Sequence, residues 1–138
     1  MRVFHCLLAA LLLSFSVTCV ASANVIGETD KDVAAIATPA LNGMLEGLKT
    51  GDYPTYSKDF DVMLRDAISK EQFVKIRTHL NDKFGLCEGK TYLGFMTKGK
   101  TTVILWKGRF EKSADDVLIS LIMIKKGNKD LVTKLMFQ

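Results

Sequence analysis

The sequence is poor in the residues that usually form disulfides and metal sites: 138 residues contain three Cys and two His. After residue 23 only His79 and Cys87 remain. A lone thiol excludes an internal disulfide, and one His with one Cys falls short of a zinc site. The acidic residues Asp59, Asp61 and Asp66 lack the Gly and Glu of a calcium loop. The sequence therefore predicts no metal and no cofactor, and a fold that is stabilised by its core.

The sequence also lacks a large excess of one charge, since it has 19 Lys and Arg against 15 Asp and Glu. A net charge of +4 is too small to indicate a nucleic-acid partner, so we expect none. Nine lysines and arginines do gather after residue 97, where turn and edge lysines commonly prevent strands from pairing with other chains. An anionic ligand or surface is the alternative role for them. With two Pro and no low-complexity linker, residues 24–138 form one predicted domain.

Much of the apolar excess of the sequence lies in the first 23 residues. Arg2 precedes apolar residues at 7–13 and 15–20, and Ala21-Ser22-Ala23 follows as a small-x-small cleavage signal. This pattern predicts a signal peptide, 1–23, that is cleaved after Ala23, and hence a periplasmic or secreted protein with no transmembrane anchor after cleavage. A lipid anchor on Cys19 is the alternative, but the three residues before Cys19 lack the pattern of a lipobox.

Helical periodicity dominates from residue 30 to residue 85. Apolar residues recur at three- and four-residue steps from Val33 to Leu48, behind Asp30 as a plausible N-cap, and Pro39 either kinks this helix or starts a new one. A second helix, with a possible break near Ser57, covers 53–67. A third begins at the capping box Ser69-Lys70-Glu71-Gln72 and ends at Gly85; its buried face is expected to carry Phe73, Ile76, Leu80 and Phe84.

After Gly85 the sequence becomes rich in β-branched residues and short turns. We expect strands near 87–97, 100–111, 115–126 and 130–137. Because their connections are short, neighbouring strands must be antiparallel. The predicted fold class is α+β: three N-terminal helices packed on a curved four-stranded antiparallel meander.

The two middle strands are apolar at both parities, at 101–106 and at 117–124. A sheet with one wet face would alternate between apolar and polar residues, so both faces must be covered. Three short helices can cover one face. We therefore expect the other face to meet a second copy of the chain, giving a homodimer through the sheet.

Several segments resemble a family of small exported bacterial proteins of unknown function. They are Leu48 to Tyr53, Tyr56 to Asp61, Ser69 to Phe73, Gly89 to Tyr92 and Val103 to Phe110. The family belongs to the nuclear-transport-factor-2-like superfamily, the cone-shaped fold shared with ketosteroid isomerase. The resemblance implies a curved sheet wrapped around helices, frequent dimerisation through the outer sheet face, and a pocket at the wide end of the cone. It brings no catalytic motif that this chain matches.

One nucleotide-binding motif matches by letter: Gly94 to Thr101 reads G-x-x-x-x-G-K-[ST]. A phosphate loop has to lead from a strand into a helix, whereas residues 102–106 are strongly strand-forming. We therefore predict a hairpin tip here and no nucleotide partner.

The remaining candidates concern a pocket. Tyr56, Tyr92 and Trp106 are the predicted ligand-binding residues, for a small apolar or amphipathic ligand, with core packing as the alternative. A nucleophilic pair of Cys87 and His79 is disfavoured, because Cys87 falls at a strand start and His79 on the flank of its helix. No catalytic residue is predicted. The function expected is binding or interaction without enzymatic activity; the alternative is an isomerase- or cyclase-type enzyme with Asp66, Tyr56 or Tyr92 as its acid/base group.

Overall fold

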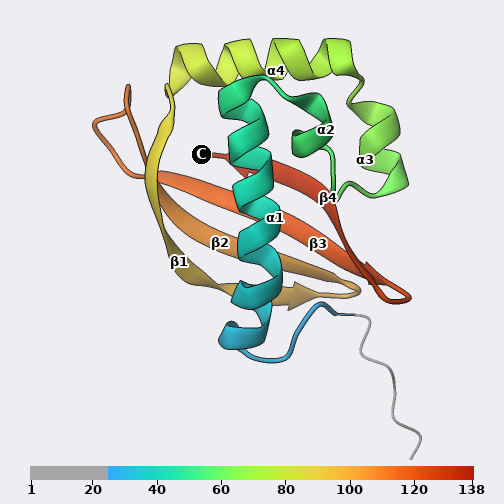
Figure 1. Ribbon diagram of the computed structural model, residues 1–138. Coiled ribbons are helices and arrows are strands. Elements are labelled where there is room, and N and C mark those ends of the chain that lie inside the picture. The colour runs from blue at the N-terminus through green and yellow to red at the C-terminus, as the bar shows by residue number, and fades with distance from the viewer. Residues whose placement is uncertain (1–24) are drawn as a thin grey trace, which may run out of the picture.

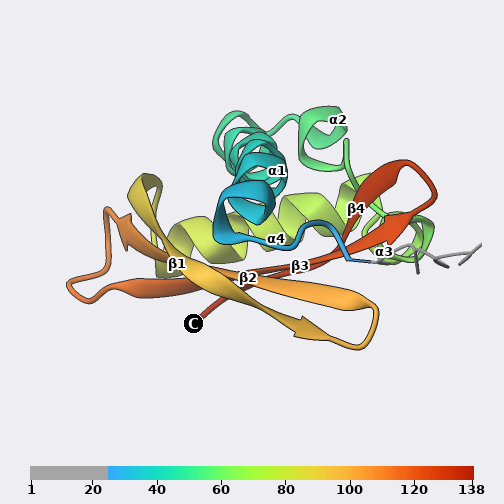
Figure 2. The ribbon, with the colours of Figure 1, turned by 90° about the horizontal axis from the view of Figure 1, so that it is seen from below.

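Helices fill the first half of the described chain and strands the second half (Figure 1). The computed structural model describes residues 25–138, so the predicted signal peptide lies outside the described residues. Four helical elements precede four strands, because the second predicted helix is divided near Ser57, as its sequence allowed. The architecture is α+β: the antiparallel sheet is open, and all helices lie toward one side of it (Figure 2).

Helix α1 (Asp30–Thr50) is continuous and contains Pro39 in its interior. Its N-cap is Thr29 and not Asp30, because the Thr29 side chain accepts a hydrogen bond from the backbone N–H of Asp32 while the Asp32 carboxylate accepts one from the backbone N–H of Thr29. Gly51 ends the helix in the left-handed conformation, with φ of 77°. Pro39 therefore lies within a single helix and does not start a new one.

Two glycines of α1, Gly43 and Gly47, have different surroundings, because only Gly47 lies close against α2 (Tyr53–Tyr56). A Cβ on Gly47 would lie 2.6 Å from the backbone nitrogen of Tyr56, whereas one on Gly43 would meet nothing nearer than the carbonyl oxygen of Thr55 at 3.8 Å. We expect Gly47→Ala to destabilise the protein by about 1–3 kcal/mol through overpacking. Gly43→Ala should stabilise it by about 0.5–1 kcal/mol, as Ala usually does in a helix. Urea denaturation measures the change in the free energy of unfolding for each variant. A change of the same sign in both variants would contradict the prediction.

A short extended segment before α3 (Val62–Ala67) pairs with the last strand. Phe60 forms a parallel bridge with Val132, whose backbone N–H donates to the Asp59 carbonyl at 2.7 Å and whose carbonyl accepts from the backbone N–H of Asp61 at 2.8 Å. These bonds cover part of an edge of the sheet that would otherwise present free backbone groups.

Asp61 fastens this segment to the sheet. Its carboxylate is 4% exposed, caps α3 and accepts a hydrogen bond of 2.6 Å from the ammonium group of Lys126. The hydrogen bond from Lys126 lowers the pKa of Asp61 below its ordinary value. The resulting stabilisation is present above the unfolded-chain pKa of about 3.9 and is lost as the pH falls through the lower pKa of the folded state.

Helix α4 (Lys70–Lys83) begins where the sequence predicts. The Ser69 hydroxyl accepts a hydrogen bond from the backbone N–H of Gln72 at 3.2 Å, which is one half of the expected capping box. On the predicted apolar face, Phe73 and Phe84 are buried, while Ile76 and Leu80 are half-buried.

The strands are β1 (Cys87–Lys98), β2 (Thr101–Phe110), β3 (Val117–Lys126) and β4 (Lys129–Phe137), in the spatial order β1-β2-β3-β4. All three pairings are antiparallel, so the predicted meander is confirmed. Lys98 pairs with Thr101 around a turn whose Gly99 has φ of 61°. The Gly94 to Thr101 segment is therefore a β-hairpin, as predicted, and not a strand-to-helix loop.

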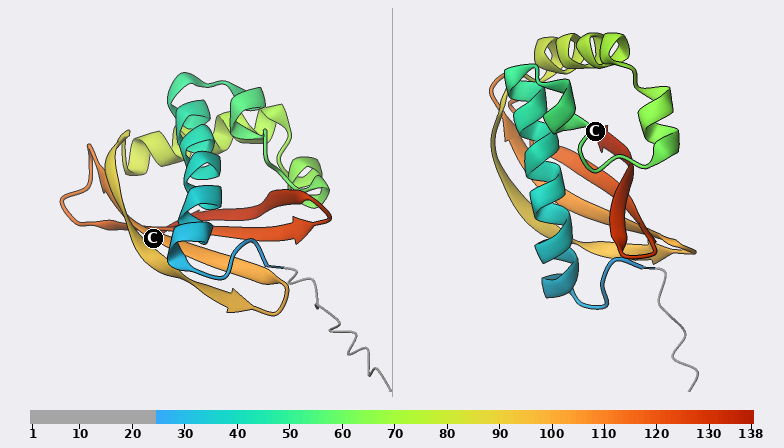
Figure 3. Two further views of the ribbon diagram at one scale, coloured as in Figure 1. Left: turned by 60° about the horizontal axis from the view of Figure 1, so that its bottom comes forward. Right: turned by 45° about the vertical axis from the view of Figure 1, so that its right-hand side comes forward.

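The core lies between the helices and one face of the sheet, here called the inner face (Figure 2). On β2 the even-numbered residues from Thr102 to Phe110 are buried, and on β3 the odd-numbered ones from Val117 to Met123. Helix α1 crosses this face and contributes Val33, Ala37, Leu41 and Met44 (Figure 3). Trp106 and Phe110 share the inner face, as their common parity predicts.

Candidate functional site

No described segment covers the opposite side of the sheet, here called the outer face (Figure 2). The strand register gives this face many apolar residues. The register places Met96 beside Val103, Val103 beside Ile122, and Leu105 beside Ser120 on this side. Its apolar members come from all four strands: Met96, Val103, Leu105, Leu118, Ile122, Ile124, Leu131 and Met136. Met96 is 53% exposed and the others are half-buried by one another. An isolated protein seldom leaves a sheet face of this composition in water.

The three predicted ligand-binding residues lie at the inner face and do not form one site. Trp106 is 1% exposed, and its ring meets that of Tyr92 edge to face at 5.8 Å. Tyr56 packs elsewhere, with its ring 4.8 Å from that of Phe73 and 5.1 Å from that of Phe60. The Tyr92 hydroxyl donates a 2.9 Å hydrogen bond to the Asp30 carboxylate. Trp106 and Tyr92 thus have the contacts of packing residues, which was the alternative weighed for them.

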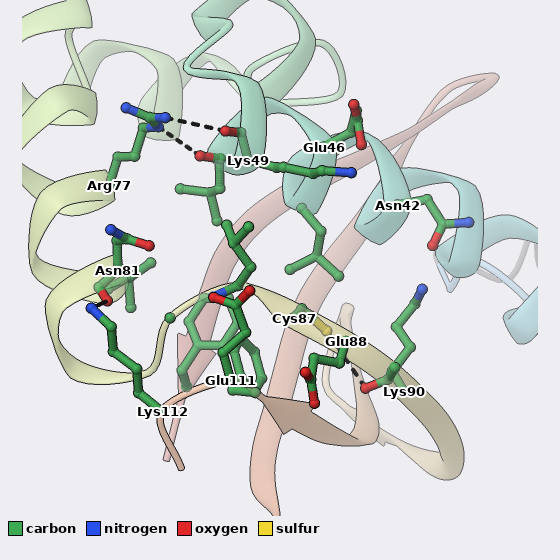
Figure 4. Close-up of a pocket in the computed structure, with 18 residues that line it drawn as sticks. Asn42, Glu46, Lys49, Arg77, Asn81, Cys87, Glu88, Lys90, Glu111 and Lys112 are labelled. Carbon is green, nitrogen blue, oxygen red and sulfur yellow. Dashed lines mark hydrogen bonds between the residues drawn. The ribbon is translucent and has the colours of Figure 1, made fainter.

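The larger of two described hollows is a recess of 640 Å³ between α1, α4 and the start of β1, here called the β1 recess (Figure 4). Leu45, Leu48 and Phe110 form part of its apolar floor. Its rim carries both cations and carboxylates, among them Lys49 and Glu46. None of Tyr56, Tyr92 and Trp106 lines this recess.

Several polar groups of the β1 recess are already used by the protein (Figure 4). The Arg77 guanidinium donates to the carbonyls of Leu48 and Lys49, at 2.7 and 3.1 Å, and so caps the end of α1. The Lys112 ammonium donates to the Asn81 carbonyl at 2.9 Å. These bonds hold α1, α4 and the β2–β3 connection together, so the positions of Arg77 and Lys112 are explained by their role in the fold.

Cys87 and His79 line different hollows. Cys87 is half-buried in the β1 recess, and its sulfur lies 3.5 Å from the Gly89 carbonyl. His79 is exposed on α4 and lines the second hollow. The structure does not bring the thiol and the imidazole together as a nucleophilic pair.

The second hollow is a cavity of 360 Å³ among α1, α2, α3, α4 and β4, here called the β4 cavity. Figure 3 (right) shows α3, α4 and β4 around this part of the molecule. Most of its lining is apolar, and its ionisable lining residues are Tyr56, His79, Lys83 and Lys134. Sequence reasoning found Tyr56 but not the three basic residues, because it assigned Lys134 to solubility and His79 to the flank of a helix, and gave Lys83 no role.

Burial raises the pKa of the Tyr56 hydroxyl to about 12, and the nearby Tyr53 adds to the shift. Burial also raises the pKa of Tyr92 to about 12, helped by its hydrogen bond to Asp30. Both phenols therefore stay protonated at neutral pH and act as hydrogen-bond donors. Asp66, the carboxylate considered for acid/base catalysis, is exposed on α3 and lines neither hollow.

Within residues 25–138, no helix is long and apolar enough to span a membrane. The same residues contain no group of three His, Cys, Asp or Glu side chains placed to hold a metal ion.

The fold and these surfaces define an α+β domain with an apolar sheet face and two hollows under its helices. No protein-family model matches the sequence. No curated protein matches it. Among solved structures, Bd1075 of Bdellovibrio bacteriovorus is similar at a TM-score of 0.47 and 11% sequence identity, over 78% of this chain and 40% of that one. The chain thus spans less than half the length of that protein, and a likeness at this level identifies neither a family nor a function.

Proposed function

We propose that this chain is an exported binding domain without enzymatic activity, which self-associates through the outer face of its sheet. The observation that carries the proposal is the apolar outer face, contributed by all four strands and left bare by the helices. A second copy of the same chain is the partner, because one apolar sheet face complements another in sheet-on-sheet packing.

The edge of the sheet at β4 favours association through the sheet face over pairing between strand edges. The edge of β4 is partly covered at Val132 by residues 59–61, which removes backbone groups from pairing with another chain. Charged side chains border the apolar surface: Lys107 and Arg109 lie on the outer side of β2, and Lys134 lies on β4 beside Ile122. An apolar centre with a charged rim is the usual anatomy of an interface.

The remaining parts of the proposal come from the sequence. The pattern of residues 1–23 supports export to the periplasm or beyond, with cleavage after Ala23. The resemblance to the nuclear-transport-factor-2-like superfamily supports a cone-shaped version of this α+β fold. We also propose a small apolar or amphipathic ligand under the helices, where the β1 recess and the β4 cavity offer space.

Sedimentation and light scattering of the processed protein test self-association. The protein from Asn24 onward should have twice the mass of one chain at micromolar concentration. Ile122→Glu places a charge in the middle of the outer face and should give a monomer. The matched control is Val74→Glu, on a 56% exposed residue of α4 that lies away from the sheet; it should leave the mass unchanged. A wild-type monomer throughout the micromolar range would refute the proposal.

A further inference from the structure

The β4 cavity combines an apolar interior with basic groups alone among its charged lining residues. Apolar side chains from α3 and its C-cap, from α4 and from β4 make up its walls: Leu64, Ile68, Ile76, Leu80, Leu135 and Phe137. The basic residues are His79, Lys83 and Lys134, and no carboxylate lines the cavity. The β1 recess differs, since Glu46, Glu88 and Glu111 line it together with its cations.

Lys83 is the lysine of the β4 cavity that is free to meet a ligand. The ion pairs of the described residues involve Lys75, Lys107 and Lys126, and none of the three cavity residues. The Lys83 ammonium lies 4.8 Å from the centre of the Phe84 ring, so it is held beside the apolar lining. Lys134 also borders the cavity, but its pairing with Ile122 places its side chain on the outer face of the sheet, so its ammonium group does not face the cavity.

Tyr56 supplies a second and independent observation. The residue is 3% exposed and lines the β4 cavity, and its hydroxyl has no hydrogen-bond partner among residues 25–138. In contrast, Tyr53 donates to the Ile68 carbonyl and Tyr92 to the Asp30 carboxylate. The Tyr56 hydroxyl is not fully enclosed, so it is a donor that a bound group in the cavity can use without replacing a protein acceptor.

We propose that the β4 cavity binds a single-chain amphiphile with an anionic carboxylate head, such as a medium-chain fatty acid. The chain lies among the apolar side chains, where each buried methylene contributes to affinity. The carboxylate meets the Lys83 ammonium at the mouth, and Tyr56 donates to it or to a water bound beside it. The volume of 360 Å³ is at the small end of the range for ligand sites, which favours a medium chain over a long one. This inference deepens the ligand-binding part of the proposed function and does not depend on self-association.

Calorimetric titration with decanoate, and with decanol as the uncharged probe of equal chain length, tests the inference. Decanoate should bind with one molecule per chain and a micromolar Kd, and decanol roughly tenfold or more weakly, because it lacks the charge-assisted bonds. Lys83→Gln should weaken decanoate binding by about tenfold or more, while Lys70→Gln, at the start of the same helix and outside the lining, should leave it unchanged. Tyr56→Phe keeps the ring and should weaken binding by roughly tenfold.

Three results would overturn the inference: no saturable binding of decanoate below millimolar concentration, equal affinity for decanol, or equal losses in Lys83→Gln and Lys70→Gln. Ile122→Glu separates this site from the outer face, because it should still bind decanoate as the wild type does. Loss of binding in Ile122→Glu would place the amphiphile on the sheet and would refute the cavity. A protein that dimerises without binding decanoate would refute this inference alone.

Discussion

Replacing Trp106 by Ala is expected to lower the free energy of unfolding by about 3–5 kcal/mol, the range for removing a fully buried large aromatic side chain. Trp106 is the largest fully buried side chain of the described residues and is 1% exposed. Its strand neighbours are Tyr92 and Ile119, and α1 covers the same inner face. An alanine here leaves a cavity that a rigid sheet can only partly close. A domain of this size has a total stability of about 5–15 kcal/mol, so the variant should be partly unfolded at moderate temperature.

Urea denaturation followed by far-ultraviolet circular dichroism measures this loss, since the variant lacks the only Trp of the chain. Leu93→Ala is the control, because Leu93 is 56% exposed on β1 and its truncation should cost less than about 0.5 kcal/mol. The result also separates the two roles considered for Trp106. A loss of less than about 1 kcal/mol would indicate an indole that faces an open ligand site, in contradiction to its packing.

Local signals in the sequence were enough to predict the order and type of the elements. The short turns at Gly99 and Gly127 can join only antiparallel strands, and both glycines have positive φ. The capping signal at Ser69 located the start of α4. The N-cap of α1 was misplaced by one residue, because Thr29 and Asp30 are both good capping residues and only the reciprocal bonds of Thr29 with Asp32 decide between them.

The arrangement of the candidate sites could not be predicted in the same way. Parity placed Trp106 and Phe110 on one face, but the sequence does not show which face α1 covers. The β4 cavity depends on residues far apart in the chain, Tyr56, His79 and Lys134, which meet only because residues 59–61 pair with β4 and α4 lies over its end. Aromatic content alone therefore grouped Tyr56 with Trp106, although they pack in separate clusters.

Truncation of two adjacent residues of β3 should lower the stability by very different amounts, since one faces the helices and the next faces outward. Leu121 is fully buried on the inner face, and Leu121→Ala is expected to cost about 2–5 kcal/mol at every protein concentration. Ile122 is half-buried on the outer face, between Val103 and Lys134 in the ladder. In the isolated chain, Ile122→Ala should cost less than about 1 kcal/mol, because its site is open to water and can relax.

Concentration separates the two effects. If the outer faces of two copies meet, the stability of the wild type rises with protein concentration, because association favours the folded state. Leu121→Ala should lower the urea midpoint equally at low and high concentration and preserve the rise. Ile122→Ala should reduce the rise and leave the dilute midpoint close to that of the wild type. Equal losses for both variants in dilute solution would mean that Ile122 is buried within a single chain, and the outer face would then no longer need a partner.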